Sequence, residues 1–146
     1  MTALQDAPNG FRQFHDQIDE LKARLLAMST RAEEMIEQAV DALLHNDHGI
    51  AEMVVASDSE LNSLEVEIEQ RAIALLALQQ PMARDLRFIV GAIRVSNDLE
   101  RIGDHAVNIA QSSLRLIEQR ATLVPDPEIE DMARRARLML SDSLDA

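Results

Sequence analysis

The sequence predicts an all-α protein: an antiparallel three-helix bundle, followed by the first part of a second repeat of the same unit. Hydrophobic residues make up 47% of the 146 residues but aromatic residues only 2%, so aliphatic side chains must build the interior. The apolar residues recur at helical spacing over long stretches, which only four glycines and four prolines interrupt. A chain of this length can bury one core of its own.

The formal net charge of −12 restricts the partners that this chain can have. It repels nucleic-acid phosphates and anionic lipid, and it attracts divalent cations or basic surfaces of other proteins. The sequence has no cysteine, which excludes disulfides and thiolate metal sites and agrees with the cytoplasmic location that we expect. No apolar run approaches the ~18–20 residues that a membrane span needs.

A flexible tail is expected over residues 1–10, which have neither the basic nor the apolar stretch of a secretory signal. A three-helix repeat then occupies residues 11–120. Its first helix is predicted from about Phe14 to Leu44, because the apolar residues alternate between steps of three and four, as the seam of a bundle requires.

The second helix is predicted from about His48 to Leu78. Asp47 can cap its N-terminus, and apolar residues recur along it every seven positions. Gln80-Pro81 ends it, since proline is well placed at the first position of a following helix.

The third helix is predicted from about Pro81 to Gln119. It has two apolar stripes, one that contains Phe88 and Ile102 and another that contains Ile93 and Val107. At 100° per residue these stripes lie on nearly opposite sides, so this helix is expected to lie between neighbours.

A linker over residues 121–126 leads to a partial helix over residues 127–146, with Asp126 as its N-cap. Residues 132–146 are identical to residues 28–42 at six of fifteen positions, at an offset of 104 residues. This similarity predicts that the last helix begins a second repeat. The alternative is an unrelated terminal helix.

The third helix concentrates oxygen-bearing side chains in the stretch DLERIGDHAVNIAQ, residues 98–111. Glu100 and Asp104 are one turn apart and share a face, which Asn108 extends. Glu100 also interrupts the second apolar stripe, where an unpaired charge is costly to bury. A bound cation would remove both the repulsion and the cost of burial, because hard cations take oxygen ligands.

An ordinary solvated face is the alternative for this stretch. Arg101 can pair with Asp104, and Arg94 with Asp98, as such pairs do on many exposed helices.

The second helix has a matching line of polar side chains, in which Asp58 and Asn62 are one turn apart and Glu65 lies near the same side. If the second and third helices are antiparallel neighbours, the two lines converge on a site for a divalent or trivalent metal ion. Iron, manganese, nickel and zinc are the candidates, alone or as a multinuclear cluster. The predicted ligands are Asp58, Asn62, Glu100 and Asp104, with Glu65 and Asn108 as weaker candidates.

Gly103 and His105 are the other unusual residues of the stretch. A glycine inside a helix costs ~1 kcal/mol relative to alanine, so Gly103 must serve close helix packing or leave room for a ligand beside Glu100. His105 could bind a metal, relay a proton or carry a phosphoryl group, although a lone helical histidine usually does none of these. No catalytic residue is predicted, because the sequence lacks Glu-x-x-His, a glycine-rich phosphate loop and a nucleophile elbow.

The string QPMARDLRFIVGAIRVSNDLERIGDHAVNIAQ, residues 80–111, closely resembles the PhoU family of bacterial phosphate-uptake regulators. The shared pattern is Gln80-Pro81, then Asp85-Leu86-Arg87, then residues 98–110 on one long helix. The resemblance implies two similar three-helix bundles in tandem, which agrees with the 104-residue offset.

The resemblance also implies a function. Members of the family restrain a high-affinity phosphate ABC transporter and its sensor histidine kinase by protein–protein contact when phosphate is plentiful. They are cytoplasmic, reach the membrane only through their partners, often form homodimers and are not enzymes. Some bind metal through Glu/Asp-x-x-x-Asp pairs on two helices. Glu100 and Asp104 fit this pattern, whereas Asp58 and Asn62 fit it with an amide in place of the second carboxylate.

Two other functions remain open from the residues alone. The first is a carboxylate-bridged metal enzyme of the helical-bundle type. The second is a structural or phosphotransfer helical module, in which His105 would carry the phosphoryl group. The seam of the partial last helix is expected to find a partner, which favours a homodimer.

Overall fold

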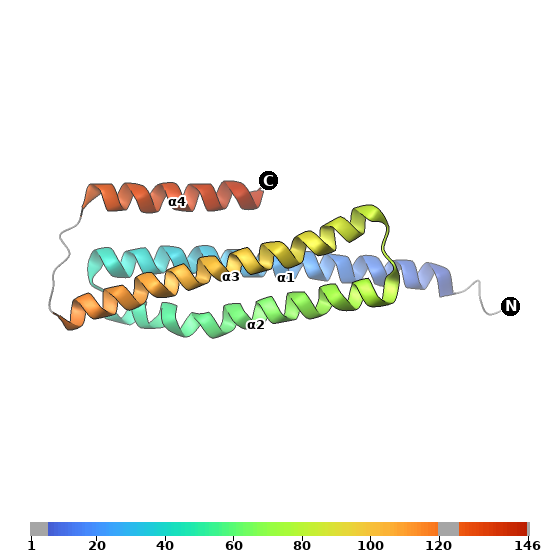
Figure 1. Cartoon of the computed structure of the whole chain (residues 1–146), viewed down its shortest axis with the longest axis horizontal. Helices are drawn as coiled ribbons and strands as arrows, with labels where there is room; N and C mark the ends of the chain where they lie inside the picture. Colours follow the sequence, from blue (N-terminus) through green and yellow to red (C-terminus); the bar gives the residue numbers. More distant parts are fainter. Residues whose placement is uncertain (1–5, 120–125, 146) are drawn as a thin grey trace.

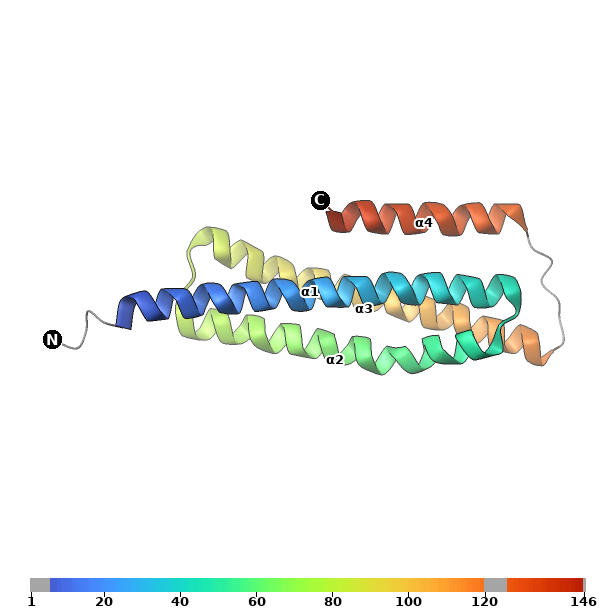
Figure 2. The same cartoon turned by 180° about the vertical axis from the view of Figure 1, so that it is seen from behind.

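The computed structural model describes residues 6–119 and 126–145. Within these residues the protein is built of four helices: α1 (Asp6–His45), α2 (His48–Gln79), α3 (Ala83–Glu118) and α4 (Pro127–Asp145). The first three run antiparallel and pack side by side, each against the other two (Figures 1 and 2). The predicted all-α class is therefore confirmed.

The start of α1 differs from the sequence prediction. The expected tail over residues 1–10 is helical from Asp6 onward, while residues 1–5 lie outside the described part of the chain. Pro8 is compatible with this start because it lies in the first turn, where backbone N–H groups have no partner within the helix. Of the predicted linker, residues 121–125 also lie outside the described residues.

Short connections make the first three helices antiparallel neighbours. Asp47 caps α2 as predicted, since its Oδ1 accepts a hydrogen bond of 3.1 Å from the Ile50 backbone N–H. Asn46 before it has a φ of 51°, a left-handed conformation that asparagine tolerates better than most residues. Ala83 rather than Pro81 is the first residue of α3, with Met82 as its N-cap, so that helix begins two residues later than predicted.

The core is aliphatic and rich in small residues. Leu21, Met28 and Met35 of α1 and Leu61 and Ile68 of α2 are fully buried and recur every seven positions. The buried face of α3 consists mostly of small side chains. Its members are Ile89, Ala92, Ser96, Leu99, Gly103, Ala106, Ala110 and Ser113. The two predicted apolar stripes flank this line, and both are partly buried against the core.

Gly103 packs directly against Leu61 of α2. A Cβ at this position would overlap the Leu61 Cδ2 methyl and lie 3.6 Å from Leu61 Cγ and 3.8 Å from Met35 Cε. Leu61 and Met35 are fully buried, so neither can move aside easily. The glycine therefore serves close helix packing.

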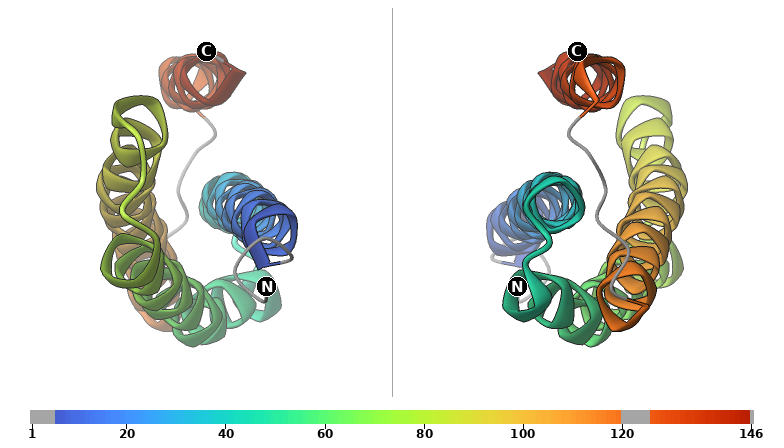
Figure 3. Two further views of the ribbon diagram at one scale, coloured as in Figure 1. Left: turned by 90° about the vertical axis from the view of Figure 1, so that its right-hand side faces the viewer. Right: turned by 90° about the vertical axis from the view of Figure 1, so that its left-hand side faces the viewer.

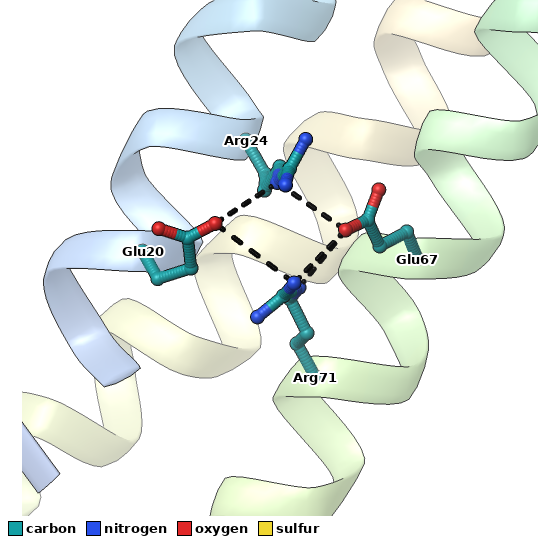
Figure 4. A network of polar contacts seen from close by, with 4 residues as sticks. All are labelled: Glu20, Arg24, Glu67 and Arg71. Carbon is teal, nitrogen blue, oxygen red and sulfur yellow. Dashed lines mark hydrogen bonds and ion pairs between the residues drawn. The ribbon is translucent and has the colours of Figure 1, made fainter. Parts of the chain in front are cut away.

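Four charged side chains tie α1 to α2 in a ring of alternating sign (Figure 4). Arg24 Nε lies 3.1 Å from Glu20 Oε1 and 3.2 Å from Glu67 Oε1. Arg71 Nη2 closes the ring, at 3.0 Å from Glu67 Oε1 and 3.8 Å from Glu20 Oε1. Such partly exposed pairs contribute little free energy singly, but a closed network fixes how the two helices are aligned.

Helix α4 lies over the groove between α1 and α3, on the side of the bundle opposite α2 (Figure 3). An ion pair of 3.1 Å between Arg137 and Glu37 holds it to α1. None of its described residues is buried. Met132 and Met139, which align with the fully buried Met28 and Met35 at the 104-residue offset, are 69% and 66% exposed. This helix therefore has an α1-like apolar face that the present chain leaves largely uncovered.

An apolar cavity of about 440 Å³ remains beneath α4. Ile36 of α1, Leu99 and Ile102 of α3, and Met139 and Leu144 of α4 line it. None of the helices within residues 6–119 and 126–145 is both long and apolar enough to cross a membrane.

The packing at Gly103 predicts opposite effects of alanine at two glycines of α3. Gly103→Ala should lower the free energy of unfolding by up to about 2 kcal/mol, because overpacking costs about 1–3 kcal/mol and the higher helix propensity of alanine returns only about 1. Gly91→Ala is the matched control. Nothing lies within 4 Å of its added Cβ, so it should stabilise by up to about 1 kcal/mol. Urea unfolding of both variants checks this, and equal stabilisation by both would show that the close contact with Leu61 is unimportant.

Candidate functional site

Four carboxylates from α2 and α3 lie near one another along the interface of these helices. Burial raises the pKa of Glu100 above its usual value, and so do a hydrogen bond of its protonated form to Asp104 and the charges of Asp104, Glu65 and Asp58. Burial likewise raises the pKa of Glu65, with further contributions from Glu69 and Asp104. The two predicted lines thus converge closely enough for their charges to repel one another.

Asp58 and Asn62 are joined within α2. Asn62 Nδ2 donates a hydrogen bond of 3.3 Å to Asp58 Oδ2. The other oxygen, Asp58 Oδ1, is buried and has no hydrogen-bond partner. A buried acceptor without a donor is unfavourable and uncommon, so a donor or a cation at Asp58 Oδ1 would stabilise the site.

The ion pairs expected on a solvated face do not form. Neither Arg101–Asp104 nor Arg94–Asp98 is among the pairs within 4.0 Å in the described residues. In the same part of the chain, no basic side chain lies within that distance of Asp58, Glu65, Glu100 or Asp104, which we call the acidic cluster. The repulsion within the acidic cluster is therefore not offset by a basic side chain in direct contact.

The side chains of the acidic cluster are suitable metal ligands, but they are not arranged around a common point. Their donor atoms are all oxygen, which hard cations prefer. Yet within residues 6–119 and 126–145 no three histidine, aspartate or glutamate side chains stand close enough together to hold a metal ion. Asn62, Asp104 and Asn108 are exposed. Asn62 is bonded to Asp58, whereas no such contact links Asn108 to the other predicted ligands within the described residues. Coordination would require side-chain rotation, which exposed residues can make readily.

Gly103 and His105 lie apart from this chemistry. Leu61 fills the space beside Gly103, so the packing explanation holds and the expected room for a ligand is not found there. His105 is exposed and lines the cavity beneath α4, together with Asp98 and Val95. None of the four carboxylates lines this cavity, so the structure does not bring His105 to them.

Sequence reasoning missed two features of α3. One is the cavity beneath α4, which depends on where α4 rests. The other is a row of arginines, Arg87, Arg94 and Arg101, that have no carboxylate within 4.0 Å among the described residues. Their seven-residue spacing was visible in the sequence, whereas their lack of partners was not.

Known proteins match most of the chain. Residues 25–113 match the family described as "PhoU domain". A PhoU homolog of Clostridium acetobutylicum, named a phosphate-specific transport system accessory protein, is 39% identical over 91% of this chain and 61% of its own length. A homolog of the same name from Pseudomonas putida is 36% identical over 92% of this chain and 53% of its own length.

Solved structures agree with the sequence matches. The crystal structure of PhoU from Pseudomonas aeruginosa superposes with a TM-score of 0.85, at 32% identity, over 91% of this chain and 64% of that one. The chain thus spans less than two thirds of the length of the relatives that it matches.

Because the pKa of Glu100 is raised, removing its charge should increase the free energy of unfolding, by an amount that depends on pH. A carboxyl with a raised pKa binds its proton more tightly when folded, so its charge destabilises the fold above that pKa, and this effect disappears as the pH falls toward the ordinary value of 4.5. In the presence of a chelator, Glu100→Gln should therefore stabilise at neutral pH by about 0.2–0.5 kcal/mol, by relief of the i,i+4 repulsion with Asp104. Urea unfolding over a pH series measures the difference.

Asp19→Asn serves as the control for this measurement, because Asp19 is exposed, lies on α1 outside the acidic cluster and has no basic side chain within 4.0 Å in the described residues. A gain from Glu100→Gln that stays constant down to pH 4.5, or an equal gain from the control, would contradict the electrostatic explanation.

Proposed function

The chain belongs to the PhoU family, and from this membership we propose that it takes part in the negative regulation of phosphate uptake. The observation that carries the proposal is the name of its relatives, which are accessory proteins of the phosphate-specific transport system. An accessory protein acts by contact with the system that it serves. We therefore propose that this chain binds a subunit of a phosphate ABC transporter and the associated sensor histidine kinase, and is not itself an enzyme.

The remaining parts of the proposal follow from the same membership. The site of action is the cytoplasmic side of the membrane, where the chain would be held only by its partners. A homodimer is the expected form, and the apolar side chains that α4 exposes, such as Met132 and Met139, give a second copy something to cover.

Metal binding at the acidic cluster is the second element of the proposal. Three observations support it: the buried Asp58 Oδ1 without a partner, the raised pKa of Glu100 and Glu65, and the lack of a basic side chain within 4.0 Å in the described residues. Asp58, Glu100 and Asp104 would hold the ion, with Asn62 and Glu65 at its margin. The ion supplies positive charge that neutralises the cluster.

The chain's own residues would turn this neutralisation into a regulatory effect. Asp58 lies on α2, and Glu100 and Asp104 lie on α3, so a shared ligand links the two helices. Asn62 already holds Asp58 in place through its side-chain amide. Occupancy would therefore change the alignment or rigidity of α2 and α3, and with it the surface that a partner meets.

Metal should raise the thermal stability of the protein through the acidic cluster. After chelation, titration with iron, manganese, nickel or zinc is expected to raise the melting temperature, with a gain of about 2.7 kcal/mol at 100 times the dissociation constant. The double variant Glu100→Gln, Asp104→Asn should lose this gain, whereas Asp19→Asn should keep it. A wild-type melting temperature that no metal changes would rule out this element of the proposal.

The transport proposal predicts direct binding. A phosphate ABC transporter from the same genome, reconstituted in neutral nanodiscs, should bind the immobilised chain, and labelled phosphate uptake into proteoliposomes should fall when the chain is added. An unrelated ABC transporter is the specificity control, and a full-length PhoU homolog is the positive control. If the full-length homolog binds and this chain does not, the first bundle with α4 is insufficient for the function.

A further inference from the structure

Most arginines of the described residues fall into two groups according to their helix; the exception is Arg12 of α1, which also has no carboxylate within 4.0 Å there. Ion pairs hold the single arginine of α2, all three of α4, and Arg24 and Arg31 of α1. By contrast, none of the five arginines of α3 has a carboxylate within 4.0 Å in the described part of the chain. Carboxylates outnumber basic side chains in this chain, whose net charge is −12, so most arginines are expected to have an ion-pair partner.

Four of these arginines share one face of α3. Arg87, Arg94 and Arg101 recur every seven residues, and Arg84 lies three residues before the first of them. All four are exposed. From Arg84 to Arg101 they span roughly 25 Å at 1.5 Å per residue. Arg87, Arg94 and Arg101 lie opposite the buried line of α3 that contains Ser96 and Gly103, so they project away from the bundle.

Apolar side chains are interleaved with them. Leu86 is 41% exposed and Val90 37% exposed, and Met82 at the N-cap is 80% exposed. Single exposed apolar residues are ordinary, but exposed apolar residues beside arginines have the composition of a protein interface, where arginine and methionine are enriched. We call Arg84, Leu86, Arg87, Val90, Arg94 and Arg101 together the arginine face.

We propose that the arginine face is a docking surface for an acidic face of a partner protein. The guanidinium group binds carboxylates through two parallel hydrogen bonds, and a row of arginines along one helix matches carboxylates spaced along an elongated partner element. The inference rests on the proposed function, in that the partner is a subunit of the phosphate transport system or its kinase.

Charge favours a protein over a polyanion or a membrane as the occupant. At physiological salt the interaction between exposed charges is screened beyond about 8 Å. A partner's carboxylates in contact with Arg87 and Arg94 are therefore attracted by those arginines and only weakly repelled by more distant acidic residues of this chain. A nucleic acid or an anionic bilayer presents phosphate over a much wider area. It would also meet the acidic remainder of this chain, which carries 26 acidic residues against 14 basic ones.

A second copy of the chain is a less suitable occupant. Its acidic cluster lies on the α2–α3 interface, so pairing it with the arginine face of another copy would join two different surfaces. Such head-to-tail contacts continue from copy to copy rather than close into a dimer.

A charge-reversal pair tests the docking surface. Arg87→Glu with Arg94→Glu changes the net charge by the same amount as Arg134→Glu with Arg135→Glu on α4, which is the control. Glutamate and arginine have similar helix propensities, and circular dichroism and thermal melting confirm that each variant folds. The first pair should weaken binding to the reconstituted transporter by roughly 100-fold and reduce its salt dependence, whereas the control should bind like wild type.

A second probe separates this surface from the proposed function. A synthetic helical peptide with glutamates every seven residues and leucines between them should bind wild-type protein but not the Arg87→Glu, Arg94→Glu variant. The same peptide with glutamines in place of the glutamates should not bind wild-type protein. If neither the transporter nor the sensor kinase binds while the acidic peptide binds through the arginine face, the proposed function is wrong and the docking surface stands.

Other outcomes would overturn the docking surface. These are equal weakening by both charge-reversal pairs, no weakening by either, or no binding of the acidic peptide. Equally tight binding to empty phosphatidylglycerol nanodiscs or to single-stranded DNA would assign the surface to a membrane or a nucleic acid instead. Self-association in sedimentation that the Arg87→Glu, Arg94→Glu variant abolishes would assign it to a second copy.

Discussion

The close packing of α3 against α2 is the constraint on which the rest of the structure depends. Small residues on the buried face of α3 allow the two backbones to approach, and Leu61 occupies the space where Gly103 has no side chain. The buried hydroxyls of this face bond within their own helix, as Ser96 does to the Ile93 carbonyl at 2.7 Å. The line therefore buries few unsatisfied polar groups, and the helices can approach at little cost.

The two interfaces of α2 differ in how their charged side chains are balanced. Between α1 and α2, glutamates and arginines alternate, so Glu20 and Glu67 each face Arg24 and Arg71. Between α2 and α3, carboxylates face carboxylates, and burial raises the pKa of Glu100 and Glu65. One interface of the bundle is neutralised by its own side chains, whereas the other has its charges balanced only by solvent or by something that binds.

Helix α3 thus presents different chemistry on each of its sides. Its buried line holds the bundle together, one flank contributes to the acidic cluster, and the other flank borders the cavity beneath α4, where His105 and Asp98 lie. Its outer side has exposed arginines, and none of them has a carboxylate within 4.0 Å in the described residues. Because α3 carries both the acidic cluster and the arginine face, a change at one of them acts on the helix that presents the other.

The sequence by itself determined the helices, the Asp47 cap and the placement of Glu100 and Asp104 on one face, because spacing and capping are local properties. Tertiary structure alone decided that Leu61 fills the space at Gly103, that Asp58 Oδ1 is left without a donor, and that Arg101 does not pair with Asp104. These outcomes depend on the rotation and separation of neighbouring helices. A periodic pattern shows which residues share a side, but the distance to the next helix is set by the packing of all the side chains between them.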